Sequence, residues 1–111
     1  MNCIFCKIIS KEIKADVAYE TPNVVVIKDV NPQAPTHLLA IPKKHYSTIL
    51  DCKDGALLAE LFTAAAHAAK AAGIDKSGFR TIVNTNEEGG QTVFHLHMHI
   101  LGGRPLGGRM G

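Results

Sequence analysis

The chain has 111 residues and a formal net charge of +2, with 12 lysines and arginines scattered among 10 acidic residues. This length suits one compact domain. The charge balance excludes a polybasic surface for nucleic acid or anionic lipid. The chain has no run of about 18 apolar residues, so we predict no membrane span. The start of the chain does not resemble a secretory signal. Three cysteines without such a signal favour reduced thiols over a disulfide framework, so we expect a cytoplasmic protein.

The first part of the chain is typical of three short strands joined by turns. Residues 17–20 and 24–28 predict a hairpin, because a Thr-Pro-Asn turn separates two apolar, β-branched runs. Two prolines within residues 31–35 forbid a helix there and favour an extended loop. Residues 37–41 then predict a third strand, which we expect Pro42 to end.

A long amphipathic helix is predicted from about Asp54 to Ala72. Asp51 or Asp54 can cap its start, and Gly73 is placed to end it. Helical spacing assigns an apolar face to Leu58, Leu61, Phe62, Ala65 and Ala69, and a polar stripe to Glu60, Thr63, His67 and Lys70. His67 therefore belongs to the solvated side, and we assign it no chemistry.

The last part of the chain predicts two more strands around a polar loop. Residues 79–84 are expected to form the fourth strand and residues 95–101 the fifth. In the fifth, His95, His97 and His99 alternate with apolar residues, a period typical of a half-buried strand. Residues two apart on a strand lie about 6.5–7 Å apart, so we expect three imidazoles to line one groove. The order of elements favours an α+β domain with an antiparallel sheet.

Two chemistries fit three imidazoles on one face of a strand. Alternatively, the histidines only form a solvated strand face and have no chemical function. Neutral imidazoles can bind a catalytic metal, or one of them can act as a nucleophile with the others as helpers. The glycine-rich turn of residues 89–92 favours the second chemistry. Its free backbone N–H groups and the Thr92 hydroxyl could hold a phosphate just before the histidines.

Residues 90–101 resemble the signature of the histidine triad (HIT) superfamily, in which three histidines alternate with apolar residues. Residues 3–9, 29–37 and 41–45 are similar to other parts of that family, and residues 102–104 (Gly-Gly-Arg) resemble its nucleotide-binding HINT branch. The resemblance implies one HIT domain over residues 1–111. Its fold would be an antiparallel sheet of about five strands, one long helix and a short N-terminal helix, in a homodimer packed through the helix and the fourth strand.

The resemblance also implies a hydrolase that cleaves the P–N bond of purine nucleoside 5′-phosphoramidates, such as AMP-lysine, through a nucleotidyl-histidine. His97 would attack the α-phosphorus, His99 would bind phosphate oxygens or assist the leaving group, and His37 would orient the triad or shuttle a proton. His97 must present an unprotonated Nε2, so its other ring nitrogen needs a fixed acceptor, for which the carbonyl of His95 is our candidate.

Three alternatives to this activity stay open. A dinucleoside polyphosphate hydrolase or nucleotidylyltransferase would use the same covalent intermediate, and a nucleotide-binding regulatory protein would have little activity. A zinc hydrolase would use all three triad histidines as ligands. HINT-type enzymes often carry a tryptophan in their C-terminal tail, whereas this chain has none, so the leaving-group specificity is not predicted.

The nucleotide contacts implied by the resemblance come from several parts of the chain. Asp29 would accept both ribose hydroxyls, and Asn84 would contact the ribose or the phosphate. The others are Phe5, Ile8, Ile27 and Val30 around the base, and Gly90, Gln91, Thr92 and His99 at the phosphate. Without the resemblance, Asp29 would be interpreted as a turn cap and the apolar residues as core.

Cys3 and Cys6 have the spacing of half a zinc site. The resemblance to zinc-bearing HIT proteins supplies His45 and His95 as the other two ligands. Two thiolates and two imidazoles close a tetrahedral site, which would be structural and would leave no position for an activated water. Catalysis would therefore require no cofactor, and Cys52 is expected to be a free thiol.

Overall fold

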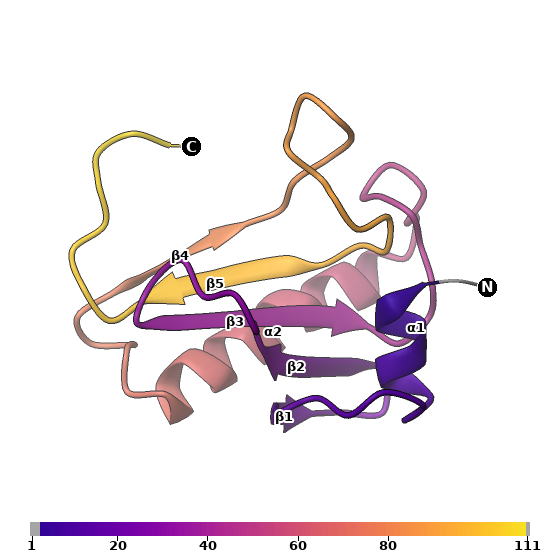
Figure 1. Cartoon of the computed structure of the whole chain (residues 1–111), viewed down its shortest axis with the longest axis horizontal. Helices are drawn as coiled ribbons and strands as arrows, with labels where there is room; N and C mark the ends of the chain where they lie inside the picture. Colours follow the sequence, from indigo (N-terminus) through magenta and orange to yellow (C-terminus); the bar gives the residue numbers. More distant parts are fainter. Residues whose placement is uncertain (1–2, 111) are drawn as a thin grey trace.

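The computed structural model describes residues 3–110 as a five-stranded sheet with a helix on each face (Figure 1). In chain order the elements are α1 (Ile4–Ile9), β1 (Val17–Glu20), β2 (Val24–Lys28), β3 (Thr36–Pro42), α2 (Gly55–Ala71), β4 (Phe79–Ile82) and β5 (Met98–Gly102). The strand order is β1-β2-β3-β5-β4, and every neighbouring pair is antiparallel. The predicted α+β class and the short N-terminal helix are confirmed.

Strands β1 and β2 have the predicted bounds, whereas β3 and β4 differ. Strand β3 includes Pro42, which was expected to stop it. Strand β5 pairs with β3 only as far as Ala40, so the β5 side of β3 is unpaired at Pro42. Because proline has no backbone N–H, it is tolerated at such an unpaired position. Strand β4 ends at Ile82, two residues before its predicted end.

The histidine segment was expected to be a strand from His95 onward, and this is wrong for its first three residues. Strand β5 begins at Met98. Upstream of it, the Leu96 N–H donates to the Tyr46 carbonyl at 2.7 Å, so the segment bonds to a loop and not to a neighbouring strand. The alternation still holds, because Leu96 is buried with Met98 and Ile100 in the core beneath α2.

Helix α2 begins and ends where the capping residues predict. Asp54 accepts a hydrogen bond from the Leu57 N–H at 3.0 Å, whereas Asp51 accepts from the Thr48 N–H and caps nothing in the helix. The helix ends before Gly73, whose φ of +76° suits a residue without a side chain.

The apolar face of α2 differs from the prediction at Phe62, and it includes three buried residues that were not assigned to it, Leu57, Ala64 and Ala68. Phe62 was assigned to this face, but it is 59% exposed. The buried residues are Leu57, Leu61, Ala64, Ala65, Ala68 and Ala69. Four of these six are alanines, so their small side chains let the helix lie close to the sheet, and Phe62 falls one residue beyond the buried stripe. His67 is exposed, as expected, and its ring stacks on Tyr19.

The two faces of the sheet carry separate cores. The larger one lies between the sheet and α2. The smaller one contains Cys3 and Phe5 from the start of the chain, packed on Val25, Ile27, Leu39 and Ile41 of β2 and β3. Helix α1 therefore covers the face opposite α2, at one end of the sheet (Figure 1). Among residues 3–110, no helix is long and apolar enough to cross a membrane.

Candidate active site and metal centre

A cavity of about 690 Å³ lies on the α1 side of the sheet. The predicted site residues that line it are Phe5, Ile8, Ile27, Asp29, Val30, His37, Thr92, His97 and His99. They come from α1, β2, β3, β5 and the segments beside them. The fold therefore brings into one cavity an apolar slot, a carboxylate and three of the histidines that were singled out in the sequence.

One ring nitrogen of His97, Nδ1, is hydrogen-bonded to the backbone, and the other, Nε2, is free to react. Its Nδ1 lies 2.8 Å from the carbonyl oxygen of His95. A carbonyl only accepts, so Nδ1 carries the proton and Nε2 keeps its lone pair. The expected acceptor is thus confirmed. The side chain is 6% exposed, and this burial lowers the pKa of His97 more than the His95 carbonyl and the Asp29 charge raise it, which favours the neutral ring.

His37 and His99 form a hydrogen-bonded pair whose direction can be assigned. The Gln33 N–H donates to His37 Nδ1 at 3.0 Å, so the proton of the neutral His37 ring is on Nε2. That Nε2 lies 2.9 Å from His99 Nδ1. His99 Nδ1 then accepts, which leaves the His99 proton on its own Nε2. Gln33 was not among the predicted site residues, because a backbone N–H leaves no signal in the sequence.

Burial lowers the pKa of both histidines, and neighbouring rings lower that of His99 further. The pKa of His99 is lowered to about 4, chiefly by burial and then by the charges of His97 and His37, against a smaller raising effect of Asp29. Burial also lowers the pKa of His37, and Asp29 opposes that shift. The pair therefore acts near neutral pH as hydrogen-bonding groups and not as cations.

Asp29 caps a turn and also lines the cavity, so the turn-capping interpretation is confirmed and the ribose contact stays a prediction. Its Oδ1 accepts from the Asn31 N–H at 2.8 Å, which is the turn-capping role. Its Oδ2 lies 3.3 Å from His37 Nε2, and the residue lines the cavity. A capped carboxylate of this kind keeps most of its acceptor positions for a ligand.

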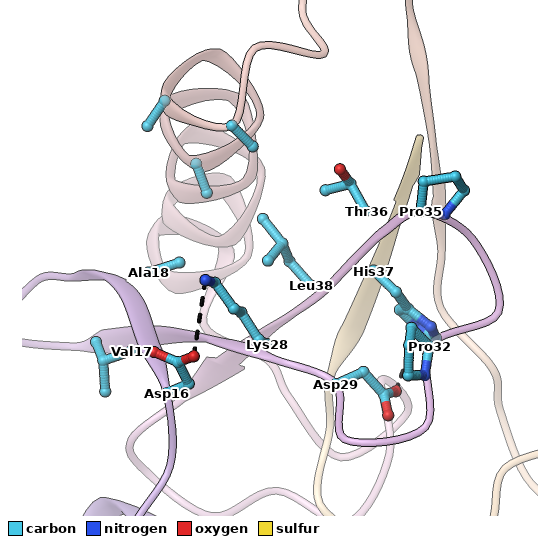
Figure 2. A pocket seen from close by; sticks show the side chains of 13 residues that line it. Asp16, Val17, Ala18, Lys28, Asp29, Pro32, Pro35, Thr36, His37 and Leu38 are labelled. Atoms are coloured by element: carbon cyan, nitrogen blue, oxygen red, sulfur yellow. Dashed lines mark ion pairs between the residues drawn. The ribbon is translucent and has the colours of Figure 1, made fainter. Parts of the chain in front are cut away.

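A second cavity, of about 580 Å³, reaches Asp29 and His37 from the α2 end of the sheet (Figure 2). Lys28 lies in it and pairs with Asp16 at 3.7 Å, and both side chains are largely exposed. The loop between Asp29 and His37 thus lies at the boundary of two cavities. Its geometry depends on the hydrogen bonds made by Asp29 and His37 themselves.

Three predicted nucleotide contacts do not line the 690 Å³ cavity: Asn84, Gly90 and Gln91. Asn84 is half-buried beyond the end of β4. The N–H groups of Gly90 and Gln91 donate to the carbonyls of Glu87 and Asn86, so the expectation of free N–H groups is wrong for these two. Thr92, the next residue, does line the cavity.

Gln91 has a different function in the structure. Its side chain is 5% exposed; Oε1 accepts from the Asn86 N–H at 2.9 Å, and Nε2 donates to the carbonyls of Ser47 and Val93 at 2.8 and 3.1 Å. One amide therefore ties the loop before the histidines to the loop after β3. The sequence gives no means of telling such a clamp from a ligand contact.

His95 lies outside the cavity and belongs to a cluster of four metal-binding side chains. The ligand atoms of Cys3, Cys6, His45 and His95 all lie within 4.8 Å of one another. His95 Nδ1 is 3.3 Å from Cys3 Sγ and 3.6 Å from Cys6 Sγ, and His45 Nδ1 is 3.3 Å from Cys6 Sγ. The expectation that all three triad imidazoles line one groove is therefore wrong, because the first is used elsewhere.

The donor set fits a tetrahedral zinc ion. Bond lengths of about 2.0–2.3 Å in a tetrahedral site imply ligand atoms roughly 3.5 Å apart. His95 Nε2 donates to the Pro42 carbonyl at 2.8 Å, so Nδ1 is unprotonated and oriented as a ligand. Burial and the neighbouring Cys3 raise the pKa of the Cys6 thiol, an effect that a bound cation would reverse. Cys52 lies apart as a buried free thiol.

The chain is similar to known proteins over nearly its whole length. A family model described as the HIT domain matches residues 10–106. The purine nucleoside phosphoramidase of Escherichia coli K12 is 47% identical over 106 residues, covering 94% of this chain and 89% of that protein. Protein HitA of Neisseria gonorrhoeae is 48% identical over 103 residues, covering 91% and 95%. A solved HIT family hydrolase from Legionella pneumophila Philadelphia 1 is 47% identical, with a TM-score of 0.95 and coverage of 99% and 100%.

Proposed function

The chain belongs to the HIT family, and on that premise we propose that it is a hydrolase that cleaves the P–N bond of purine nucleoside 5′-phosphoramidates. The observation that carries the proposal is the hydrogen bond from His97 Nδ1 to the His95 carbonyl. It leaves an unprotonated Nε2 on a ring that lines the cavity and stays neutral near pH 7. The similarity to the phosphoramidase of E. coli supports the choice of substrate.

The reaction proceeds in two displacements at phosphorus. His97 Nε2 attacks the α-phosphorus and forms a P–N bond, while the P–N bond to the leaving amine breaks and its electron pair goes to the amine nitrogen, which takes up one proton. The nucleotidyl-histidine is then a cationic ring, stabilised by the His95 carbonyl and by the Asp29 charge. Water then attacks phosphorus and forms a P–O bond, losing a proton to solvent, while the P–N bond to His97 breaks and its electron pair returns to Nε2. The products are the 5′-monophosphate and the neutral ring.

His99 and His37 have distinct tasks in this scheme. With His99 Nδ1 accepting from His37, the remaining Nε2–H of His99 is the donor for the phosphate oxygens or the departing nitrogen. His37 cannot pass a proton onward from Nδ1, because that nitrogen accepts from the Gln33 N–H. We therefore propose that His37 orients His99 and is not a proton shuttle.

The nucleoside would lie along the rest of the cavity. Asp29 would accept the ribose hydroxyls, and Thr92 would donate to the phosphate. The base would lie in the apolar slot formed by Phe5, Ile8, Ile27 and Val30. Gly90 and Gln91 would act only by shaping the loop that carries Thr92, and Asn84 would contact the substrate only if the loop moved.

We also propose that Cys3, Cys6, His45 and His95 hold a structural zinc ion. When bound, the ion would supply cross-linking and charge neutralisation, and no open coordination position for water. It would fasten α1, which contributes Phe5 and Ile8 to the base slot, to the segment that precedes His97. A fixed α1 is what the slot requires, because a helix of six residues has little stability of its own.

We further propose a homodimer packed through α2 and β4. Strand β4 is at one edge of the five-stranded sheet, where unpaired backbone groups can bind another strand. Phe62 on the outer face of α2 is 59% exposed and Phe79 on β4 is 37% exposed. Burial of both aromatic side chains would give the interface an apolar centre.

The test of the activity is to trap the intermediate. The protein is mixed with AMP-lysine, quenched within the first turnovers and analysed by mass spectrometry after proteolysis. We expect an adenylyl group on the peptide that contains His97, and none in His97→Ala. Turnover is compared with that of a diadenosine polyphosphate. Faster cleavage of the polyphosphate would replace this proposal with its closest alternative, and absence of any adduct with either substrate would contradict the covalent scheme.

A further inference from the structure

We propose that binding of the ribose hydroxyls to Asp29 locks the proton of His37 on His99, so that the sugar is recognised in the chemical step as well as in binding. The inference rests on the proposed function and adds a link between two of its parts. Asp29 would act as a positioning residue for His99, through His37, in addition to holding the sugar.

The structural basis is one donor with two acceptors nearby, of which His99 Nδ1 is hydrogen-bonded and Asp29 Oδ2 lies within ion-pair distance. Ligand atoms of Asp29, His37 and His99 lie within 4.8 Å of one another. His37 Nε2 is 2.9 Å from His99 Nδ1 and 3.3 Å from Asp29 Oδ2. Because the Gln33 N–H occupies His37 Nδ1, the neutral ring has a single proton to donate at this point. Figure 2 shows the Asp29 carboxylate beside the His37 ring from the neighbouring cavity.

The two acceptors compete on unequal terms in the free protein. Asp29 carries a negative charge, and charge-assisted hydrogen bonds are about twice as strong as neutral ones. His99 Nδ1 is neutral but closer. When His37 donates its hydrogen bond to Asp29, His99 Nδ1 loses its donor, and the His99 ring can take either tautomer. The tautomer with the proton on Nδ1 presents a lone pair to the phosphate and is unproductive.

Bound ribose removes this competition. Two sugar hydroxyls donating to the Asp29 carboxylate would satisfy the acceptor positions left by the Asn31 N–H and weaken its attraction for His37. His37 would then donate to His99 alone. His99 would keep its own proton on Nε2, where it meets the phosphate oxygens. Recognition of the sugar by Asp29 therefore sets the donor that His99 presents to the phosphate.

The test is a kinetic cycle between the sugar and His37. We would measure kcat and KM for AMP-lysine and for its 2′,3′-dideoxy analogue, with the wild-type protein and with His37→Phe, which keeps a ring but has no donor. For the wild type, loss of the hydroxyls is expected to lower kcat about five- to tenfold, the effect of one hydrogen bond. For His37→Phe, kcat for AMP-lysine is expected to exceed kcat for the dideoxy analogue by less than about twofold. The ratio of the two KM values is expected to stay as in the wild type.

A control and a second variant keep the result unambiguous. Thr92→Val alters the phosphate end of the cavity without touching Asp29 or His37 and should keep the wild-type kcat ratio. If His37→Phe fails to fold, as judged by circular dichroism, His37→Leu, which also has no donor, replaces it. Equal kcat ratios in the wild type and the His37 variant, or a wild-type penalty confined to KM, would overturn the inference. Failure of the wild type to cleave AMP-lysine would instead contradict the proposed function.

Nitrogen NMR of the histidine rings gives a readout that does not depend on turnover. Adenosine, which has no phosphorus to attack, is compared at saturation with 2′,3′-dideoxyadenosine. We expect adenosine alone to shift the His99 ring toward the tautomer protonated on Nε2. The same His99 spectrum with both nucleosides would overturn the inference.

Discussion

The two ends of the histidine segment use the same side chain in opposite ways. At one end, His95 Nε2 donates to the Pro42 carbonyl, which leaves Nδ1 among two thiols and a second imidazole. At the other, His97 Nδ1 donates to the His95 carbonyl, which leaves Nε2 toward the cavity. In both cases a backbone carbonyl selects the tautomer. The difference teaches that the role of each histidine is decided by the ring nitrogen that the backbone occupies.

The largest effect is expected at the cavity end. His97→Ala should lower turnover of AMP-lysine by about four orders of magnitude or more, because it deletes the nucleophile. Binding of AMP, measured by calorimetry, should change only a few-fold, and thermal stability should be retained. Turnover within about tenfold of the wild type would mean that the two ends do not differ in the way proposed.

The metal end should respond in the opposite manner. His95→Ala breaks the four-ligand set but leaves the backbone carbonyl that orients His97, so we expect loss of one equivalent of zinc and a free energy of unfolding lower by about 3 kcal/mol or more. The folded variant should retain most of its kcat. Metal content and thermal denaturation measure the effect.

Cys52→Ser is the matched control for the metal end, because Cys52 is buried but lies outside the cluster. It should keep its zinc. If His95→Ala lost turnover as completely as His97→Ala while staying folded, the structural assignment of the metal would be contradicted.

A smaller effect is expected at Gln91, which lies between the two regions. Gln91→Ala removes three part-buried hydrogen bonds to backbone groups, so the free energy of unfolding should fall by about 1–3 kcal/mol. KM should change less than kcat, because the side chain does not line the cavity. A large rise in KM with unchanged stability would indicate a direct contact with the nucleotide.

A dependence of stability on pH also belongs to the cavity end, and it is weakest near neutral pH, where His99 is mostly neutral in both the folded and the unfolded chain. The pKa of His99 is lowered to about 4 in the folded protein, whereas the unfolded chain titrates near pH 6.5. Between these values the unfolded state binds more protons, so the free energy of unfolding falls as the pH drops from about 6.5 toward 4. Urea denaturation across this range should show a shallower slope in His99→Gln. An equal slope would contradict the assignment to His99.

Most of the fold could be predicted from local patterns. The alternation in residues 96–100, the capping carboxylate of Asp54 and the glycine after α2 are short-range signals, and each gave the right element. Phe62 is a residue whose exposure such short-range signals do not predict. Helical spacing places it next to the buried stripe, and only the width of the contact with the sheet decides that it is exposed.

The candidate site was predictable as a set of residues but not as a set of contacts. The resemblance to the HIT family indicated nine residues that line the cavity and the four clustered ligands, but also Asn84, Gly90 and Gln91, which do not line it. It did not indicate that the Gln33 N–H fixes the tautomer of His37, or that Gln91 clamps two loops. Both depend on backbone atoms brought together by folding, and side-chain identity in the sequence carries no information about them.

Helix α1 has only six residues, yet it carries Phe5 and Ile8, and its first turn includes Cys6. A segment this small can open without the rest of the molecule unless it is fastened, on timescales that amide hydrogen exchange resolves. The persistence of the base slot therefore depends on the proposed zinc ion, and removal of the metal is expected to raise amide exchange in α1 while exchange in the sheet that carries the nucleophile stays slow.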